Sequence, residues 1–519
     1  MLASICSRLC SPLGPTVVAA AVALGACTDD GPVVVVHVQA RPAVADVTVL
    51  SVALANDSSQ QTESFAVGGR DFPLSFSVQT PGRDGDLTID VTARDGDGLT
   101  RGLGVVVVPI GDGRVDADVM LEPQDFVVNT TFVGSQDLAF RLDGGGRQLA
   151  VGADGTFTIG WSDTCQMVGR CDVFGRRFDA TGAPIDTAIA ASDGQFNLNQ
   201  TDGETGYEPS LVTDRTGNTL AAWTTFGETY AVVIDADGDY VTTTETAVAT
   251  ATSPGTPAVT VFPDGRYLVA WADTAPTAGQ TLVVARLLSA AGLPINNPIT
   301  STNAAFTVST TARTTDETPA VVALGNGSAL AFAWRVGSDL RGRFYGAAGT
   351  PTGADLLLAS HASDTVGPPQ LARLGSDVVL AYRRATTGGG DADNGKLILR
   401  RFSPSGAGLG TPVTVTDDVE SGPVALAVDG TRVGVAWSAC ETGPDGAGCG
   451  IRFRAYDDNL APLGDAVLVN STTAGDQEDP SLGWLPDGSA AVTWSDTSAT
   501  DPDRDGTAVR ARIIYPLAP

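Results

Sequence analysis

The feature of the sequence that most constrains its fold is a segment that recurs seven times between about residue 124 and the C-terminus. Each copy contains an alternating apolar strand that ends in one large aromatic residue, and the intervals between these anchors run from 48 to 63 residues. The anchors are Trp161, Trp223, Trp271, Trp334, Tyr382, Trp437 and Trp494. A period of this length is typical of repeat architectures, in which each copy is one supersecondary unit.

The same parts surround each anchor in the same order. An apolar segment and a turn such as Pro486-Asp487-Gly488 precede the anchor strand, and two further strands follow it. Four strands per copy at this period describe one propeller blade. The residue before the anchor is small in every copy: Gly160, Ala222, Ala270, Ala333, Ala381, Ala436 and Thr493. Because side chains alternate across a strand, large side chains face small ones, which predicts that the anchors form the blade cores and not a ligand-stacking platform.

The two ends of the repeat region complement each other. The last copy stops after its third strand, at residues 513–515, whereas residues 125–131 resemble a fourth strand. We therefore predict that residues 124–519 form a seven-bladed β-propeller closed by strand 125–131, because closure removes the exposed edges of an open sheet.

Upstream of the repeats, short apolar runs alternate with turn-rich stretches. This pattern predicts a small antiparallel β-sandwich of immunoglobulin-like shape over residues 33–123. The predicted fold class is all-β throughout, with the sandwich followed by the propeller.

The N-terminus has the features of an export signal over residues 1–26. Its apolar run is too short to span a bilayer, which needs about 20 residues. The sequence Leu24-Gly25-Ala26-Cys27 resembles the lipobox of bacterial lipoproteins. That resemblance implies lipidation of Cys27, a linker over residues 27–32 and membrane attachment through the lipid. Thr28 after the cysteine favours the outer membrane or cell surface. The alternative is an ordinary signal peptide with a chance cysteine.

The composition of the chain excludes some classes of partner and of catalytic site. The chain has 60 Asp and Glu against 31 Lys and Arg, for a formal net charge of -29. Such an acidic chain repels phosphate backbones, so we expect no nucleic-acid partner. The two histidines, His37 and His361, leave little room for histidine metal sites or Ser-His-Asp chemistry, and we expect His361 at the surface.

Four cysteines remain once the signal and Cys27 are set aside. They form two close pairs, each just after an anchor strand: Cys165 with Cys171, and Cys440 with Cys449. An even number in an exported chain predicts two disulfides. A metal or redox role would need reduced thiols, and no histidines match them.

One acidic loop matches the start of a calcium site. Residues 501–506 place Asp501, Asp503 and Asp505 at alternate positions before Gly506. Arg512 stands where an EF-hand needs its bidentate Glu, so Asp496 is the candidate further ligand. The spacing thus leaves two interpretations open, a solvated acidic turn and Ca²⁺ as a cofactor held by these carboxylates.

Arginines recur on the third strand of the copies: Arg176, Arg177, Arg286, Arg343, Arg400, Arg401, Arg454 and Arg510. Propeller enzymes such as sialidases grip a carboxylate with three arginines, but here the arginines occupy one repeated position. Repetition favours pairing with carboxylates of neighbouring strands or blades.

The segments Gln477-Glu478-Asp479-Pro480 and Trp494-Ser495-Asp496, with the turn at residues 486–488, resemble repeats of secreted, calcium-rich adhesin-like bacterial proteins and surface lipoproteins. The resemblance implies a propeller with a binding, adhesive or scaffold role toward a protein or glycan. The alternative is a glycan-active hydrolase or lyase that uses carboxylates at the channel mouth, and a third hypothesis is a purely structural envelope component. Acids and arginines that converge on the channel from different blades would favour the enzyme, whereas repeat-symmetric residues would favour the binder.

Overall fold

The computed structural model divides the chain into two compact units, residues 1–124 and 125–519. The described residues are 5–6, 33–56, 59–80, 85–110, 113–132, 134–138, 147–163, 171–189, 194–200, 206–225, 227–250, 255–274, 280–310, 318–325, 327–361, 364–386, 395–419, 422–440 and 448–516. All regular structure in these residues is β-strand. They contain no helix long and apolar enough to cross a membrane.

The first unit is a sandwich whose strands follow one path of eight. In spatial order these are β1 (Ile5–Cys6), β5 (Leu74–Gln79), β2 (Val33–Ala40), β8 (Arg114–Pro123), β7 (Thr100–Ile110), β6 (Gly85–Arg94), β3 (Val49–Asn56) and β4 (Ser59–Ala66). The path bends where β7 and β8 pair over only two residues of each strand. Inward-facing residues such as Val36, Val52 and Ile89 are fully buried in one shared core. Alternating buried and exposed positions therefore produce two layers facing each other.

One pairing in the sandwich departs from the prediction. The sheet was expected to be antiparallel, but β2 and β8 run parallel, from Val33 beside Arg114 to Ala40 beside Leu121. Parallel neighbours need a long connection. These strands are the first and last of the sandwich core, so the other strands between them in sequence supply that connection.

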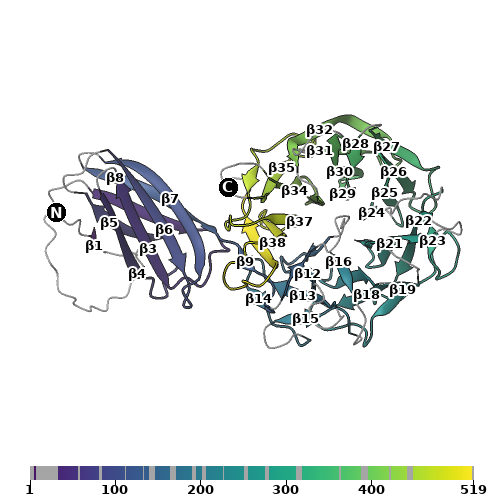
Figure 1. The fold of residues 1–519 in the computed structure, drawn as a ribbon, viewed down its shortest axis with the longest axis horizontal. Helices are drawn as coiled ribbons and strands as arrows, with labels where there is room; N and C mark the ends of the chain where they lie inside the picture. Colours follow the sequence, from purple (N-terminus) through teal and green to yellow (C-terminus); the bar gives the residue numbers. More distant parts are fainter. Residues whose placement is uncertain are drawn as a thin grey trace. The chain divides into compact units, whose positions relative to one another are not determined.

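The second unit is a seven-bladed β-propeller, which confirms the predicted fold class (Figure 1). Blade 1 contains β10 (Gln136–Asp137), β11 (Leu149–Val151), β12 (Phe157–Asp163), β13 (Val173–Phe178), β14 (Pro184–Ile185) and β15 (Gln195–Asn197); blade 2 β16 (Tyr207–Thr213), β17 (Thr219–Thr224), β18 (Glu228–Ile234) and β19 (Thr246–Thr250); blade 3 β20 (Ala258–Val261), β21 (Tyr267–Thr274), β22 (Thr281–Leu288) and β23 (Phe306–Thr307); blade 4 β24 (Ala320–Ala323), β25 (Leu330–Val336), β26 (Asp339–Tyr345) and β27 (Leu356–Ser360). Blade 5 contains β28 (Asp364–Val366), β29 (Gln370–Leu374), β30 (Asp377–Thr386), β31 (Gly395–Phe402) and β32 (Gly408–Val419); blade 6 β33 (Ala425–Val428), β34 (Val433–Ala439), β35 (Gly450–Tyr456) and β36 (Val467–Leu468); blade 7 β37 (Gln477–Trp484), β38 (Ala490–Asp496), β39 (Ala508–Ile514) and β9 (Phe126–Val127).

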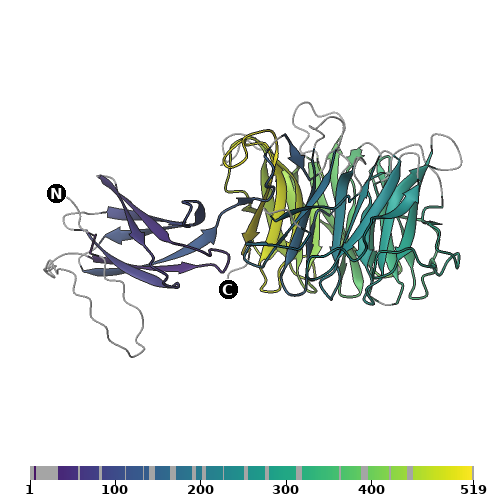
Figure 2. The same cartoon turned by 90° about the horizontal axis from the view of Figure 1, so that it is seen from below.

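The innermost strands of the blades line the central channel. Each of β11, β16, β20, β24, β29, β33 and β37 contacts the next one around the ring. In side view the blades stand next to one another with their strands steeply inclined (Figure 2). Residues at the two ends of these innermost strands therefore lie at the two mouths of the channel.

The anchor residues lie on the second strand of each blade and are buried. All seven have an exposed fraction of 2% or less. The small residue before the anchor permits close blade contact: a Cβ added to Gly160 of blade 1 would lie 2.8 Å from the Leu211 side chain of blade 2. Large and small positions thus interlock between blades, as close packing requires.

Blade 7 is completed by the segment that enters the propeller. β9 pairs antiparallel with β39, Val127 beside Arg510 and Phe126 beside Ala511. Asp125 fixes this join, because its Oδ2 accepts hydrogen bonds from the backbone N–H of Ser471 and of Thr472, both at 2.8 Å. The Arg510 guanidinium donates to both Asp125 (3.1 Å) and Asp496 (2.6 Å). Three buried charges therefore support the closure of the ring.

The repeated arginines mainly join blades through backbone carbonyls. Four of them donate to a carbonyl in or just after the outermost strand of the preceding blade: Arg176 to Val128 (2.9 Å), Arg286 to Val248 (2.6 Å), Arg343 to Val308 (2.7 Å) and Arg400 to Leu358. In blade 7 the same bond is made by Arg512, two residues after the repeated Arg510, to Val469 (2.7 Å). The expectation of carboxylate partners is wrong for these bonds, whereas Arg343, Arg401 and Arg510 do pair with Asp355, Asp377 and Asp496. The outermost strand has carbonyls without a ladder partner, and the guanidinium satisfies them.

Candidate functional site

The two mouths of the channel differ in chemistry. We call Asp137, Glu208, Glu478 and Asp479 the acidic rim; they lie in β10 and where β16 and β37 begin. We call Arg215 and Arg373 the arginine rim; Arg215 follows the end of β16 and Arg373 lies near the end of β29. Glu208 and Arg215 thus stand at opposite ends of one innermost strand, β16.

Irregular backbone shapes the acidic rim. The ladders of β16 and β37 both shift register just after the strand begins, between Tyr207 and Ser210 and between Glu478 and Ser481. Within the shifts, Glu208 and Asp479 have φ values of 55° and 54°. Each is followed by a proline, which cannot donate to the ladder. These β-bulges re-aim the two carboxylates relative to the regular pleat, as bulges beside functional sites often do.

The acidic carboxylates raise one another's pKa values. Burial, and then the charges of Glu478, Asp137 and Glu208, raise the pKa of Asp479 to about 7. Burial, and then the charge of Glu478, raise the pKa of Asp137 to about 6. These causes place carboxylates of blades 7, 1 and 2 within electrostatic reach of one another. Near neutral pH the acidic rim therefore contains both protonated and ionised carboxyl groups.

Neighbouring hydroxyls hold Glu208 of the acidic rim. Its backbone N–H donates to Oγ of Ser162 at 2.9 Å, and its carboxylate accepts a hydrogen bond from Oγ1 of Thr256 in blade 3. Four consecutive blades thus contribute to one end of the channel. In the sequence, Glu478 and Asp479 stand out only as part of a repeat motif, and neither Asp137 nor Glu208 belongs to a motif noted above. An acidic residue followed by proline at the start of the innermost strand, in copies two and seven, was the signal that could have found the site.

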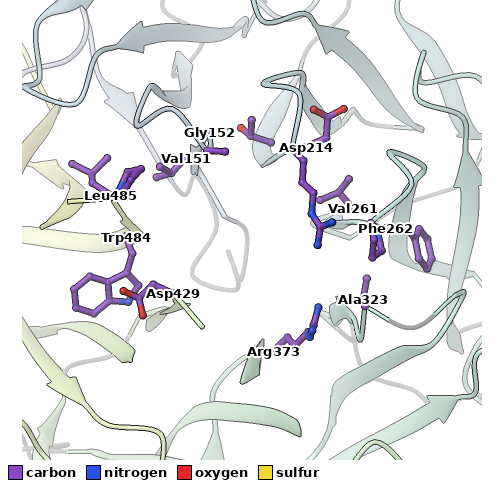
Figure 3. A pocket seen from close by; sticks show the side chains of 16 residues that line it. Val151, Gly152, Asp214, Val261, Phe262, Ala323, Arg373, Asp429, Trp484 and Leu485 are labelled. Carbon is purple, nitrogen blue, oxygen red and sulfur yellow. The ribbon is translucent and has the colours of Figure 1, made fainter. Parts of the chain in front are cut away.

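The arginine rim surrounds a cavity of about 430 Å³. Figure 3 shows Asp214, Arg373, Asp429 and Trp484 around this opening. A second cavity of about 310 Å³ shares Arg373, Asp429 and Trp484 and continues to Arg147. Arg147 of blade 1 donates a hydrogen bond to the carbonyl of Leu371 in blade 5, so its side chain reaches across the channel.

The carboxylates of the predicted calcium loop have protein partners. Asp503 is buried and accepts from Nδ2 of Asn129 at 2.8 Å, and Asp505 accepts from the N–H of Gly134 at 3.3 Å. Asp496 is paired with Arg510, while exposed Asp501 pairs with Arg504, which lowers the pKa of the Asp501 carboxyl. Across the described ranges, no three Asp, Glu, His or Cys side chains are grouped to hold a metal ion. Calcium binding stays a prediction.

The structure tests only part of the cysteine predictions. Cys440 and Cys449 form a disulfide across a sequence separation of nine, where strand β34 of blade 6 ends and strand β35 begins. Cys171 is buried, but its predicted partner Cys165 lies outside the described residues, as does the lipidation candidate Cys27.

Both histidines contact residues that belong to neither rim. His361 Nε2 lies 3.1 Å from the hydroxyl of the anchor Tyr382, with ring centroids 5.8 Å apart. His361 is therefore half-buried against a blade core and not simply at the surface. In the sandwich, His37 contacts Ser75 at 2.8 Å and Asp116 at 3.2 Å.

Comparison with known proteins gives likeness in fold. No family model matches the sequence, and no curated protein matches it. A solved protein of unknown function from Dyadobacter fermentans aligns with a TM-score of 0.43 and 10% identity over 76% of this chain and 98% of its own. A polysaccharide lyase gives 0.41 and 9% over 75% and 94%, and the NanB sialidase from Streptococcus pneumoniae gives 0.41 and 11% over 95% and 96%. At these identities the likeness concerns the fold alone.

Proposed function

We propose that the propeller is a glycan-active enzyme that cleaves glycosidic bonds by acid–base catalysis at the acidic rim. The observation that carries the proposal is the raised pKa of Asp479, about 7, among carboxylates supplied by three different blades. Convergence of carboxylates from different blades favours an enzyme over a repeat-symmetric binder. Strongly perturbed carboxyl groups in a channel mouth are typical of catalytic sites.

The roles follow from the protonation states. Asp479 keeps a proton near neutral pH and donates it to the leaving glycosidic oxygen. An ionised neighbour, with Asp137 as our choice, takes a proton from the attacking water, whose oxygen bonds to the anomeric carbon as the glycosidic C–O bond breaks. Asp479 ends ionised and Asp137 ends protonated, and exchange with solvent restores both.

The test is release of new reducing ends from a panel of neutral and acidic polysaccharides by the protein lacking residues 1–26. Asp479→Asn should lower kcat at least about 100-fold, since general acids contribute about 10² to 10⁴ in rate. Activity should peak between the apparent pKa values of about 6 and about 7 of the coupled carboxyls. Asp417→Asn, at an exposed ion pair with Lys396, is the matched control and should keep full activity.

Two results would contradict the hydrolase. One is the appearance of an unsaturated uronate that absorbs in the ultraviolet, which would indicate a lyase. The other is no product from any glycan while a ligand still binds, which would favour the second candidate, a binding, adhesive or scaffold module for a protein or glycan. The open arginine rim favours that second candidate, because it offers charged side chains at a mouth with no acid–base pair assigned to it.

We further propose an exported protein attached to the bacterial envelope through lipid on Cys27, at the outer membrane or cell surface. Support comes from the resemblance of residues 24–27 to a lipobox. The measurement is palmitate labelling of the protein in cells, which should disappear in the Cys27→Ser variant. Unchanged labelling of that variant would refute lipid attachment at Cys27.

A calcium ion at the loop of residues 501–506 is proposed as a structural cofactor, supported by the spacing of Asp501, Asp503 and Asp505. Calcium should raise the melting temperature, chelator should reverse the rise, and Asp505→Ala should abolish it. An unchanged melting temperature would leave a solvated acidic turn stabilised by the Asn129 and Gly134 contacts.

A further inference from the structure

We propose that the arginine rim is an oxyanion-binding site, which takes the carboxylate or sulfate group of an anionic sugar. The site uses none of the acidic-rim residues and stands independently of the proposed acid–base chemistry. Its evidence is the position of two exposed arginines, the state of the nearby acids and the size of the cavity.

Arg373 is held in place by the backbone around it. Its Nε donates to the carbonyl of Gly375 at 2.7 Å. The rest of its guanidinium lies against Gly325 of blade 4, where an added Cβ would stand 1.9 Å from Nη1. Gly325 also has φ of +74°, which favours glycine. This arginine is therefore oriented without using a carboxylate.

Arg215 is fixed at its backbone and free at its tip. The preceding Asp214 accepts hydrogen bonds from the N–H and Oγ1 of Thr216, at 2.8 Å and 2.7 Å, and from the N–H of Asn218 at 3.0 Å. These bonds shape the turn that carries Arg215. Within the described ranges, the Arg215 side chain itself has neither a hydrogen bond nor an ion pair.

The acids that line the cavity are engaged elsewhere. Asp429 is paired with Arg432, whose guanidinium lies 4.5 Å from the Trp484 ring. Asp214 is held by its own turn and by the hydroxyl of Tyr267 at 3.2 Å. Arg432 thus neutralises Asp429, whereas Asp214 keeps its charge: burial alone would raise the pKa of its carboxyl, but the hydrogen bonds from Thr216, Asn218 and Tyr267 lower it. Among Asp214, Asp429, Arg215, Arg373 and Arg432 the arginines therefore outnumber the carboxylates by one, in a chain whose formal net charge is -29.

Deeper in the channel, Arg147 adds to this excess. Burial lowers the pKa of its guanidinium to about 10. Its side-chain partner in the described structure is the Leu371 carbonyl, an uncharged group. A buried cation without an anion is costly, so a ligand carboxylate would be stabilised there.

The dimensions suit a sugar acid. The rim cavity of about 430 Å³ has room for a monosaccharide with its hydration, and it continues into the cavity beside Arg147. Planar guanidinium groups bind carboxylate and sulfate oxygens in paired hydrogen bonds, which gives geometric selectivity over neutral hydroxyls.

The test is calorimetric titration of the protein lacking residues 1–26 with glucuronate, glucose and inorganic sulfate. We expect glucuronate to bind, glucose not to bind, and affinity to fall with added salt. Arg215→Gln and Arg373→Gln should each weaken glucuronate binding at least tenfold, whereas Arg504→Gln, at an exposed ion pair, should not. Sulfate that binds as tightly as glucuronate would support the oxyanion site and would show that a free inorganic anion, without a sugar, is enough to fill it.

Glucuronate binding that is absent, or unchanged in both rim variants, would overturn the proposal. Melting temperatures equal to the parent protein exclude misfolding as the cause of a loss. If Arg373→Gln does not fold, Arg373→Lys replaces it: a lysine keeps the charge but not the paired donors, and should still weaken binding. Because reducing-end release depends on the acidic rim, its loss and the loss of glucuronate binding are separate outcomes.

Discussion

The two rims of one channel show how a repeated scaffold acquires different chemistry at its two ends. At the acidic rim, innermost strands begin with bulges at Glu208 and Asp479, and buried carboxyls raise one another's pKa values. At the arginine rim, the strands end in tight turns whose acids are satisfied locally, which leaves Arg215 and Arg373 available. The blades repeat, but these residues do not, so function resides where the repeats diverge.

The largest expected effect comes from weakening the β9–β39 join that closes the ring. Without closure neither the acidic rim nor the arginine rim would be assembled. Arg510→Ala leaves Asp125 and Asp496 buried without their cation and should lower the free energy of unfolding by about 3–5 kcal/mol. Chemical denaturation measures the change. Arg504→Ala breaks an exposed pair and should change stability by less than about 1 kcal/mol. Equal effects of the two substitutions would show that the buried charges do not support closure.

An intermediate effect should appear when only the acidic rim is changed. Folding raises the pKa of the Asp479 carboxyl from 3.8 to about 7. Its contribution to the free energy of unfolding is therefore fully present below pH 3.8, where the carboxyl is protonated in both states, and is lost as the pH rises through about 7. Asp479→Asn should therefore raise the melting temperature at pH 8 and leave glucuronate binding intact. Scans at pH 4 and pH 8 check the sign. A variant less stable than the parent at pH 8 would contradict mutual repulsion of the carboxylates.

The smallest expected effect on stability comes from a substitution that disturbs the arginine rim alone. Gly325→Ala puts a methyl group where Nη1 of Arg373 lies and strains a positive φ, at a cost of about 1 kcal/mol in stability. It should weaken glucuronate binding as much as Arg373→Gln while reducing-end release is unchanged. Gly337→Ala, also at positive φ but with open space around its Cβ, is the matched control. Binding that survives Gly325→Ala would mean that Arg373 does not depend on that turn.

The repeat made most of the fold readable from sequence, because alternation and spacing are local properties. The anchors, the small residues before them and the closing strand all follow from pattern, and they lie where blade packing requires. Pairing between distant strands was less accessible. The parallel β2 and β8 neighbours join the first and last core strands of the sandwich, a register that alternation alone does not specify.

The candidate sites were less predictable because they depend on which blades face each other. Arg147 and its acceptor Leu371 are 224 residues apart, and no local pattern links them. The repeated arginines were noticed, but sequence could not distinguish carboxylate from carbonyl acceptors. In contrast, Asp501, Asp503 and Asp505 formed a conspicuous motif, yet in the structure each has its own protein partner.

The join between β9 and β39 has a consequence for how the chain folds. Asp125 and Arg510, which meet there, are 385 residues apart. The segment that enters the propeller is synthesised before all the blades, but its partner strand comes last. Blade 7 therefore stays incomplete until almost the whole chain has been synthesised, and until then β9 lacks its partner β39 and the ring has a bare edge. Such late, non-local closure is slow and exposes the chain to wrong pairing, so a chain interrupted before residue 508 would remain an open array of blades.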